Sequence, residues 1–358
     1  MNVLKKRTNL SVVGATATLA VVLVGCVGGD SESVVAGDSE SVVAGDSTSI
    51  TFNATGGFMS ESLVTAVVEP FTAETGIEVV MTAPNDLAKM RIMVESGNVD
   101  WDVVTADPSF SILYCDEYVE KLDFDIIDTS NLDPSLVSDC TVPMITPAYI
   151  LIYNTETYGD NPPTSWADFF DVEKFPGSRG MADWVDAGML EAAMASSGAS
   201  DPSQIDLDVA LRELDKIKDD AVFWGSGAEM QESFENNRID MAIGFMARAW
   251  TAMDQGSTYD IVWNEAIYFY DALMVVKGSK NKDAAMEFIN FALQEGPQSK
   301  LTELTVYPGA NLKSQPQLTG VQTKFAPQER EKAIMRDYNW WTTNLDEATE
   351  EWTTWKVG

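Results

Sequence analysis

The sequence predicts an α/β fold built from at least two units, because strand and helix patterns alternate along a chain that is long enough for two hydrophobic cores. Roughly 310 of the 358 residues follow the N-terminal segments, and chains of that length usually divide into separate domains. Strands that alternate with helices typically pair in a parallel sheet. Such sheets bind ligands at the carboxyl ends of their strands, so the fold class predicts a binding crevice there.

The alternation is clearest in the first part of the chain. Apolar runs predict strands, and longer periodic patterns predict helices. We expect strands at 49–53, 77–81 and 101–105, a turn at 54–57, and helices at 61–75 and 87–96. Gly76 should end the first of these helices, although Pro70 interrupts its hydrogen-bond pattern.

The same pattern recurs further along. We expect an apolar strand at 150–153 and helices at 209–219, 281–294 and 337–355. The helix expected at 281–294 is amphipathic, and its apolar face is formed by Ala285, Phe288, Ile289 and Ala292. Gly296-Pro297 should stop this helix. The helix at 337–355 carries Trp340, Trp341, Trp352 and Trp355, most of which we expect to pack this helix onto one of the units.

Residues 1–26 are expected to form a lipoprotein signal peptide. Basic residues at 5–7 precede an apolar stretch at 10–24, which is too short for a confident membrane span. The segment 23–26 resembles a bacterial lipobox, in which the cysteine, here Cys26, is acylated. The alternative is an ordinary signal peptide with an incidental cysteine. Both place the protein outside the inner membrane, in the periplasm or at the cell surface.

Residues 27–47 are expected to form a disordered tether. An eight-residue sequence occurs at 30–37 and again at 38–45, and it is dense in Gly, Ser and Asp and lacks aromatic residues. Such a segment cannot bury enough apolar surface to offset the entropy lost on ordering.

The charge and the amino-acid content narrow the class of protein. The formal net charge is −33, which makes nucleic acids and anionic membranes poor partners and favours cationic solutes. Solubility in salty surroundings is the simpler explanation of the charge. The chain contains no histidine, so the commonest general base is missing, and an enzyme is disfavoured. A secreted hydrolase with paired carboxylates remains a remote alternative.

Two cysteines remain after Cys26. Cys115 and Cys140 form an even pair in an exported chain, where oxidation is permitted. We expect a disulfide between them, and two buried free thiols are the alternative.

Several segments in a shared order resemble the bacterial extracellular solute-binding proteins of the spermidine/putrescine-binding family. They include FTAETGIEV at 71–79, WDVV at 101–104, TSWADFFD at 164–171, and the shorter matches at 175–177, 263, 270–271, 276–281, 288–291 and 307–308. The resemblance implies a two-lobe periplasmic-binding-protein fold of type II, with a hinge cleft between discontinuous lobes. By this similarity lobe 1 holds residues 48–150 and 266–312, and lobe 2 holds 151–265 and 313–358. It also implies a monomer without cofactor that delivers a polyamine-type solute to the permease of an ABC importer.

The resemblance also implies an amine site. An ammonium group needs a carboxylate and aromatic faces, and the family places an acid at Asp271 and a stacking ring at Phe269. Tyr307 occupies the place of a ligand-facing tyrosine. Trp263 is either a cleft wall or core. A strand-end aspartate that caps a turn is the alternative for Asp271.

Arg248 decides the class of ligand. It follows Phe245 in a segment where the family has a tryptophan, and a cleft arginine together with Asp271 would suit a zwitterion. An ω-amino acid such as 4-aminobutyrate is therefore a rival to a polyamine, unless Arg248 forms a salt bridge within the protein.

Four further residues are weaker candidates for ligand contact: Thr55, Asp107, Asp183 and Trp184. Polyamine binders of the family place acids near residues 181–186 that bind the second amine, and here Asp183 or Asp186 is only an approximate substitute for them. A ferric-ion receptor is less favoured because adjacent tyrosines are missing, and a chemoreceptor subunit cannot be separated from a transport subunit by sequence.

Overall fold

The computed structural model describes residues 49–326 and 332–358. The predicted signal peptide, Cys26 and the predicted tether lie outside these ranges. The described residues all belong to one unit, which contains every element named below. Within the described ranges, no helix is both long enough and apolar enough to cross a membrane.

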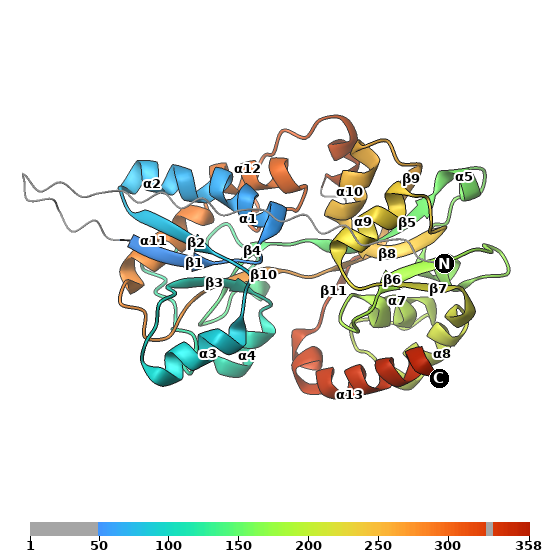
Figure 1. Cartoon of the computed structure of the whole chain (residues 1–358), viewed down its shortest axis with the longest axis horizontal. Helices are drawn as coiled ribbons and strands as arrows, with labels where there is room; N and C mark the ends of the chain where they lie inside the picture. Colours follow the sequence, from blue (N-terminus) through green and yellow to red (C-terminus); the bar gives the residue numbers. More distant parts are fainter. Residues whose placement is uncertain (1–48, 327–331) are drawn as a thin grey trace, which may run out of the picture. The chain divides into compact units, whose positions relative to one another are not determined.

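The first of two sheets has five strands in the order β2-β1-β3-β10-β4 (Figure 1). Their bounds are β1 Ser49–Asn53, β2 Glu78–Thr82, β3 Val103–Ala106, β4 Val142–Ile145 and β10 Asp271–Val275. Strand β1 pairs in parallel with β2 and β3, whereas β10 is antiparallel to both β3 and β4. The expected parallel sheet is therefore mixed, because β10 returns to this sheet from the other one and runs in the opposite direction.

The second sheet has six strands in the order β11-β9-β5-β8-β6-β7. Their bounds are β5 Ala148–Asn154, β6 Arg179–Ala182, β7 Ala221–Trp224, β8 Met241–Phe245, β9 Tyr259–Tyr268 and β11 Ile334–Met335. Strand β5 is antiparallel to β8 and β9, whereas β6 is parallel to β7 and β8. The chain passes between the two sheets directly before β5 and directly after β9. Both β5 and β9 cross the predicted lobe boundaries by a few residues, and the division of the chain into lobes stays a prediction.

Helices cover both faces of the first sheet (Figure 1). They are α1 Gly57–Leu63, α2 Glu69–Thr75, α3 Leu87–Ser96, α4 Ser109–Tyr114, α11 Lys282–Ala292 and α12 Glu295–Thr305. Consecutive side chains of a strand point to opposite faces, so Val103 packs with Phe52 and Phe288 in one apolar cluster and Val104 packs with Met90 in another. The helices packed on both faces hold the first sheet in place, including the edge at which β1 and β3 have their carboxyl ends.

The second sheet is covered in the same way. Its helices are α5 Thr155–Tyr158, α6 Trp166–Phe170, α7 Met189–Ser196, α8 Leu207–Asp215, α9 Gly227–Glu235, α10 Met246–Asp254 and α13 Tyr338–Val357. In α13, Trp341, Trp352 and Trp355 are buried, and each large apolar side chain that is fully buried contributes ~1.5–3 kcal/mol. The helix expected at 337–355 is confirmed, whereas Trp340 is only partly buried and the helix contacts α4 as well as α8.

Three expected helices differ from the structure, and the one expected at 209–219 is α8, which spans Leu207–Asp215. The helix predicted at 61–75 begins earlier, at Gly57, and contains a π-helical segment at Val64–Val68. This segment ends two residues before Pro70, which lacks the N–H that the regular pattern requires. It ends as expected at Gly76, whose φ of 75° is left-handed. The expected stop at Gly296-Pro297 is wrong, because both residues lie in the first turn of α12, where a missing N–H costs nothing.

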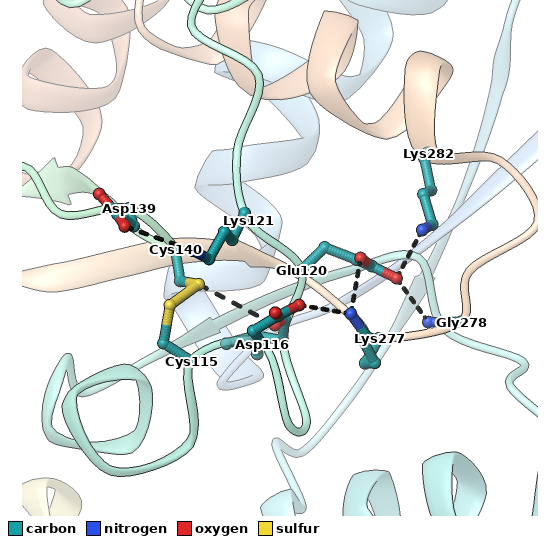
Figure 2. A network of polar contacts seen from close by, with 10 residues as sticks. Cys115, Asp116, Glu120, Lys121, Asp139, Cys140, Lys277, Gly278 and Lys282 are labelled. Atoms are coloured by element: carbon teal, nitrogen blue, oxygen red, sulfur yellow. Dashed lines mark hydrogen bonds and ion pairs between the residues drawn. A yellow bond between two sulfur atoms is a disulfide. The ribbon is translucent and has the colours of Figure 1, made fainter.

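Cys115 and Cys140 form the expected disulfide, with Cα atoms 5.6 Å apart (Figure 2). Glu120 lies beside it and accepts hydrogen bonds from the Gly278 N–H at 2.9 Å and from Lys277, and it forms an ion pair with Lys282 at 2.7 Å. Burial alone would raise the pKa of Glu120, but these donors hold it below its usual range. The network therefore ties the disulfide loop to the segment that follows β10.

Candidate ligand-binding site

A cavity of about 480 Å³ is lined by residues from both sheets. Thr55 and Asp107 follow the carboxyl ends of β1 and β3, and Asp271 opens β10. Because β10 is antiparallel to β3, pairing Ala272 with Ala106, its first residue lies at the same edge as the last residues of β3. The fold thus places residues from distant parts of the sequence at one sheet edge.

Asp271 presents a carboxylate to this cavity. It is half-buried, and within residues 49–326 and 332–358 it has no hydrogen-bond or ion-pair partner. Burial, together with the charge of Asp107, raises its pKa to about 6. It caps no turn, so the alternative interpretation of this residue has no support in the structure.

Arg248, in the first turn of α10, supplies a positive charge to the same cavity. Its Nη1 donates to Oε1 of Gln231 at 3.1 Å, and its guanidinium carbon lies 5.2 Å from the centre of the Phe58 ring. No carboxylate of the described chain lies within ion-pair distance of it, which removes the internal salt bridge that was the alternative. A Cβ atom on Gly227 would lie 3.0 Å from Nε, so the side chain packs closely over the start of α9.

Aromatic rings form one wall of the cavity. Tyr149 stacks on Phe269 with ring centres 4.7 Å apart and lies 4.8 Å from Phe245. Trp184 lies 6.5 Å from Phe245 and also lines the cavity. Apolar faces of this kind suit the methylene groups of a ligand and the face of an ammonium group.

Tyr307 lines the cavity from the end of α12. It follows Val306, which has a φ of 58°, a conformation that a β-branched residue adopts at a cost of about 1–2 kcal/mol. Burial raises the pKa of the Tyr307 phenol; Asp271 raises it further, and Arg248 lowers it. The phenol therefore lies within the fields of both charged residues.

Sequence reasoning missed a second arginine in the wall. Arg336 lines the cavity, but its Nε donates to Oε1 of Glu191 at 3.2 Å and its guanidinium also binds the backbone oxygen of Asp186. Burial alone would lower the pKa of Arg336. Its interactions with groups that include Glu191 and Tyr149 outweigh burial, so the pKa lies above its usual value. No local pattern marks Arg336, because its partners lie about 150 residues away in the sequence.

Eight of the ten predicted contact residues line the cavity, and two do not. The eight are Thr55, Asp107, Trp184, Phe245, Arg248, Phe269, Asp271 and Tyr307. Trp263 instead donates from Nε1 to the backbone oxygen of Lys324 at 2.8 Å. Asp183 binds Lys356 and lines a separate hollow against α13. The place expected for Asp183 is taken by Asp186, which lines the main cavity.

The model of the family "Bacterial extracellular solute-binding protein" matches residues 66–328, which is well over half of the chain. The chain belongs to this family and is a solute-binding protein. The resemblance seen in the sequence and the two-lobe α/β fold are both confirmed.

Individual relatives fall into two groups. The chain is 29% identical over 319 residues to the gamma-aminobutyric acid-binding protein of Pseudomonas aeruginosa. This alignment covers 86% of the chain and 90% of the relative. It is 26% identical over 275 residues to the spermidine/putrescine-binding periplasmic protein of Escherichia coli, covering 71% and 76%.

Solved structures show the same fold over nearly their whole length. The Atu4243-GABA receptor is 32% identical with a TM-score of 0.78, covering 86% of this chain and 98% of the receptor. An ABC transporter substrate-binding protein from Bradyrhizobium japonicum is 26% identical with a TM-score of 0.79, covering 86% and 99%.

Proposed function

We propose that this protein captures a small ω-amino acid such as 4-aminobutyrate and delivers it to an ABC importer. The observation that carries the proposal is that the Arg248 guanidinium and the Asp271 carboxylate line the same cavity, and neither has an ion-pair partner in the described chain. Partly buried charges are stable only when they are compensated. A zwitterion compensates both at once.

The carboxylate of the ligand fits at Arg248. A guanidinium binds a carboxylate through two parallel hydrogen bonds, which gives both strength and orientation. The start of α9 lies beside it, because Gly227 lines the cavity and is the first residue of that helix. The first amides of a helix have no acceptor within the helix and carry a partial positive charge, so they favour an anion at this end.

The ammonium group of the ligand fits at Asp271. The stacked rings of Tyr149 and Phe269 line the same cavity and offer their faces to the methylene groups between the two charged ends. The similarity to a gamma-aminobutyric acid-binding protein and to a GABA receptor supports this assignment. Bridging contacts from both lobes would favour the closed state of the hinge.

A polyamine is the second candidate. Asp107 and Asp186 add two carboxylates to the cavity, and a spermidine/putrescine-binding protein is among the relatives. A diamine, however, would leave Arg248 uncompensated and would bring a second positive charge toward it.

The place of the protein in the cell follows from its N-terminal segments and its family. We infer that residues 1–26 act as a lipoprotein signal, that cleavage before Cys26 leaves this cysteine as the acylated N-terminus, and that the mature protein works as a monomer in the periplasm or at the cell surface. A binding role fits the family better than catalysis.

Truncated ligands test the proposal directly. Calorimetric titrations would compare 4-aminobutyrate with butyrate, which lacks the amine, with butylamine, which lacks the carboxylate, and with putrescine. We expect 4-aminobutyrate to bind and each truncated ligand to bind at least roughly 100-fold more weakly, because each leaves one charged side chain uncompensated. Equal affinity for butylamine and 4-aminobutyrate would disprove the zwitterion, and tighter binding of putrescine would favour the polyamine.

A further inference from the structure

A second cavity of about 270 Å³ adjoins the ligand cavity, and we call it the annex. Three residues, Asp107, Asp186 and Arg336, line both spaces, so the two spaces adjoin at these side chains. The annex lies between α4, which follows β3, and α13, and these two helices are in contact.

Apart from the shared charged residues, the annex is mainly apolar. Its wall includes Leu87, Phe110, Leu113, Tyr114, Trp341 and Leu345. Leu113 and Leu345 are 53% and 44% exposed, so much of their apolar surface remains in contact with water. An apolar group that entered the annex would remove this surface from water, which is favourable.

The annex opens from the acidic end of the ligand cavity. Arg248 lines only the main cavity, whereas Asp107 and Asp186 line both. Burial is the largest cause of the raised pKa of Asp271 and of Asp186, and the charge of Asp107 adds to both, so Asp107 lies near each of these two carboxylates. A ligand with its carboxylate on Arg248 therefore has its ammonium group next to the mouth of the annex.

We propose that the solute is an ω-amino acid whose amine carries an apolar alkyl substituent, and that this substituent occupies the annex. The proposal rests on the proposed function and names a narrower class of solute for the same site. A secondary ammonium keeps its positive charge for Asp271 and extends beyond it, whereas 4-aminobutyrate ends there and leaves the annex unfilled. The side chains that line an unfilled apolar space lack the van der Waals contacts that a bound group would provide.

The probe is N-butyl-4-aminobutyrate, titrated by calorimetry against 4-aminobutyrate with the purified full chain. Each buried methylene group strengthens binding by about fourfold, so we expect the butyl compound to bind at least roughly tenfold tighter. The variant Leu113→Trp fills the annex, and it should abolish this preference while changing the affinity for 4-aminobutyrate by less than about twofold.

The matched control is Ile112→Trp. Ile112 lies in the same helix, is 44% exposed and does not line the annex, so this variant should keep the preference for the butyl compound. Both positions are at the surface, and circular dichroism would verify that both variants fold.

The outcomes separate the two proposals. If 4-aminobutyrate binds and the butyl compound binds no tighter, the annex proposal is wrong and the proposed function stands. The annex proposal also fails if Leu113→Trp keeps the preference or if Ile112→Trp loses it. Absence of binding by both compounds overturns the proposed function and the annex proposal with it.

Discussion

Arg336 and Glu191 form a buried ion pair in the wall of the ligand cavity, with Nε and Oε1 3.2 Å apart and both side chains at most 4% exposed. Trp341 donates its Nε1 to the same carboxylate oxygen at 2.8 Å. This pair compensates one of the two arginines that line the cavity. Arg248 therefore supplies the positive charge that is free to bind a ligand.

The Arg336–Glu191 pair should be important for stability. Glu191→Gln leaves a guanidinium buried without its counter-charge, and we expect the free energy of unfolding to fall by about 3–5 kcal/mol. Urea denaturation followed by tryptophan fluorescence would measure it. Asp139→Asn is the control, because Asp139 pairs with Lys121 at 3.8 Å on the surface, and it should cost less than about 1 kcal/mol. Equal losses in the two variants would contradict this account.

Ligand affinity should depend on the protonation of Asp271. Its pKa of about 6 in the unliganded protein means that the carboxylate is charged at pH 7.5 and mostly neutral at pH 5, while the amine of the ligand stays charged throughout. The affinity for 4-aminobutyrate should therefore fall by roughly tenfold between these values. Asp271→Asn should bind weakly at both. A constant wild-type affinity over this range would refute the assigned role.

The same carboxylate should destabilise the unliganded protein. The folded-state pKa of Asp271 is above its usual value of 3.8, so its proton-linked contribution to stability is present below about pH 4 and is lost as the pH rises through about 6. Asp271→Asn should raise the free energy of unfolding at pH 8 by about 1–2 kcal/mol, and should have little effect at pH 4. Urea melts at both pH values check this, and a variant less stable than wild type at pH 8 would contradict it.

The net charge of −33 should make stability depend on salt. Like charges repel in the folded state, and the screening length falls from about 30 Å at 0.01 M salt to about 3 Å at 1 M. We expect Tm to rise by at least roughly 5 °C over this range in scanning calorimetry. Sucrose of matched osmolality is the control, and the same rise in sucrose would show that screening is not the cause.

Those elements whose ends are marked by local signals could be predicted from the sequence. The helix at 87–96 has the bounds expected, because Asp86 accepts from the Lys89 N–H at its start and Gly97, with a φ of 71°, ends it. Gly296-Pro297 was misinterpreted because the same two residues that stop one helix also fit the first turn of the next.

The antiparallel entry of β10 could not be predicted from the sequence. Strand periodicity gives no direction, and this strand joins a sheet whose other members lie more than 100 residues earlier. The antiparallel direction of β10 matters for the site, because it places Asp271 at the sheet edge where β3 ends. The resemblance to a family located this residue, and the residues alone did not.

Arg336 and Tyr149 could not be found from sequence because their roles depend on tertiary contacts. Tyr149 lies inside an apolar strand, where it looks like core, but it lines the cavity with its ring stacked on Phe269. Trp263 shows the opposite case, since an aromatic residue in a half-buried strand was a plausible wall and instead binds the Lys324 backbone.

The most direct test of the central claim is the effect of Arg248→Gln on calorimetric titrations with 4-aminobutyrate and putrescine. Arg238→Gln is the matched control, because Arg238 is an exposed arginine that pairs with Glu232 on the surface. We predict that wild type and the control bind 4-aminobutyrate tighter than putrescine. Arg248→Gln should lose at least about 100-fold in affinity for 4-aminobutyrate and none for putrescine. Unchanged binding of 4-aminobutyrate by Arg248→Gln would contradict the account.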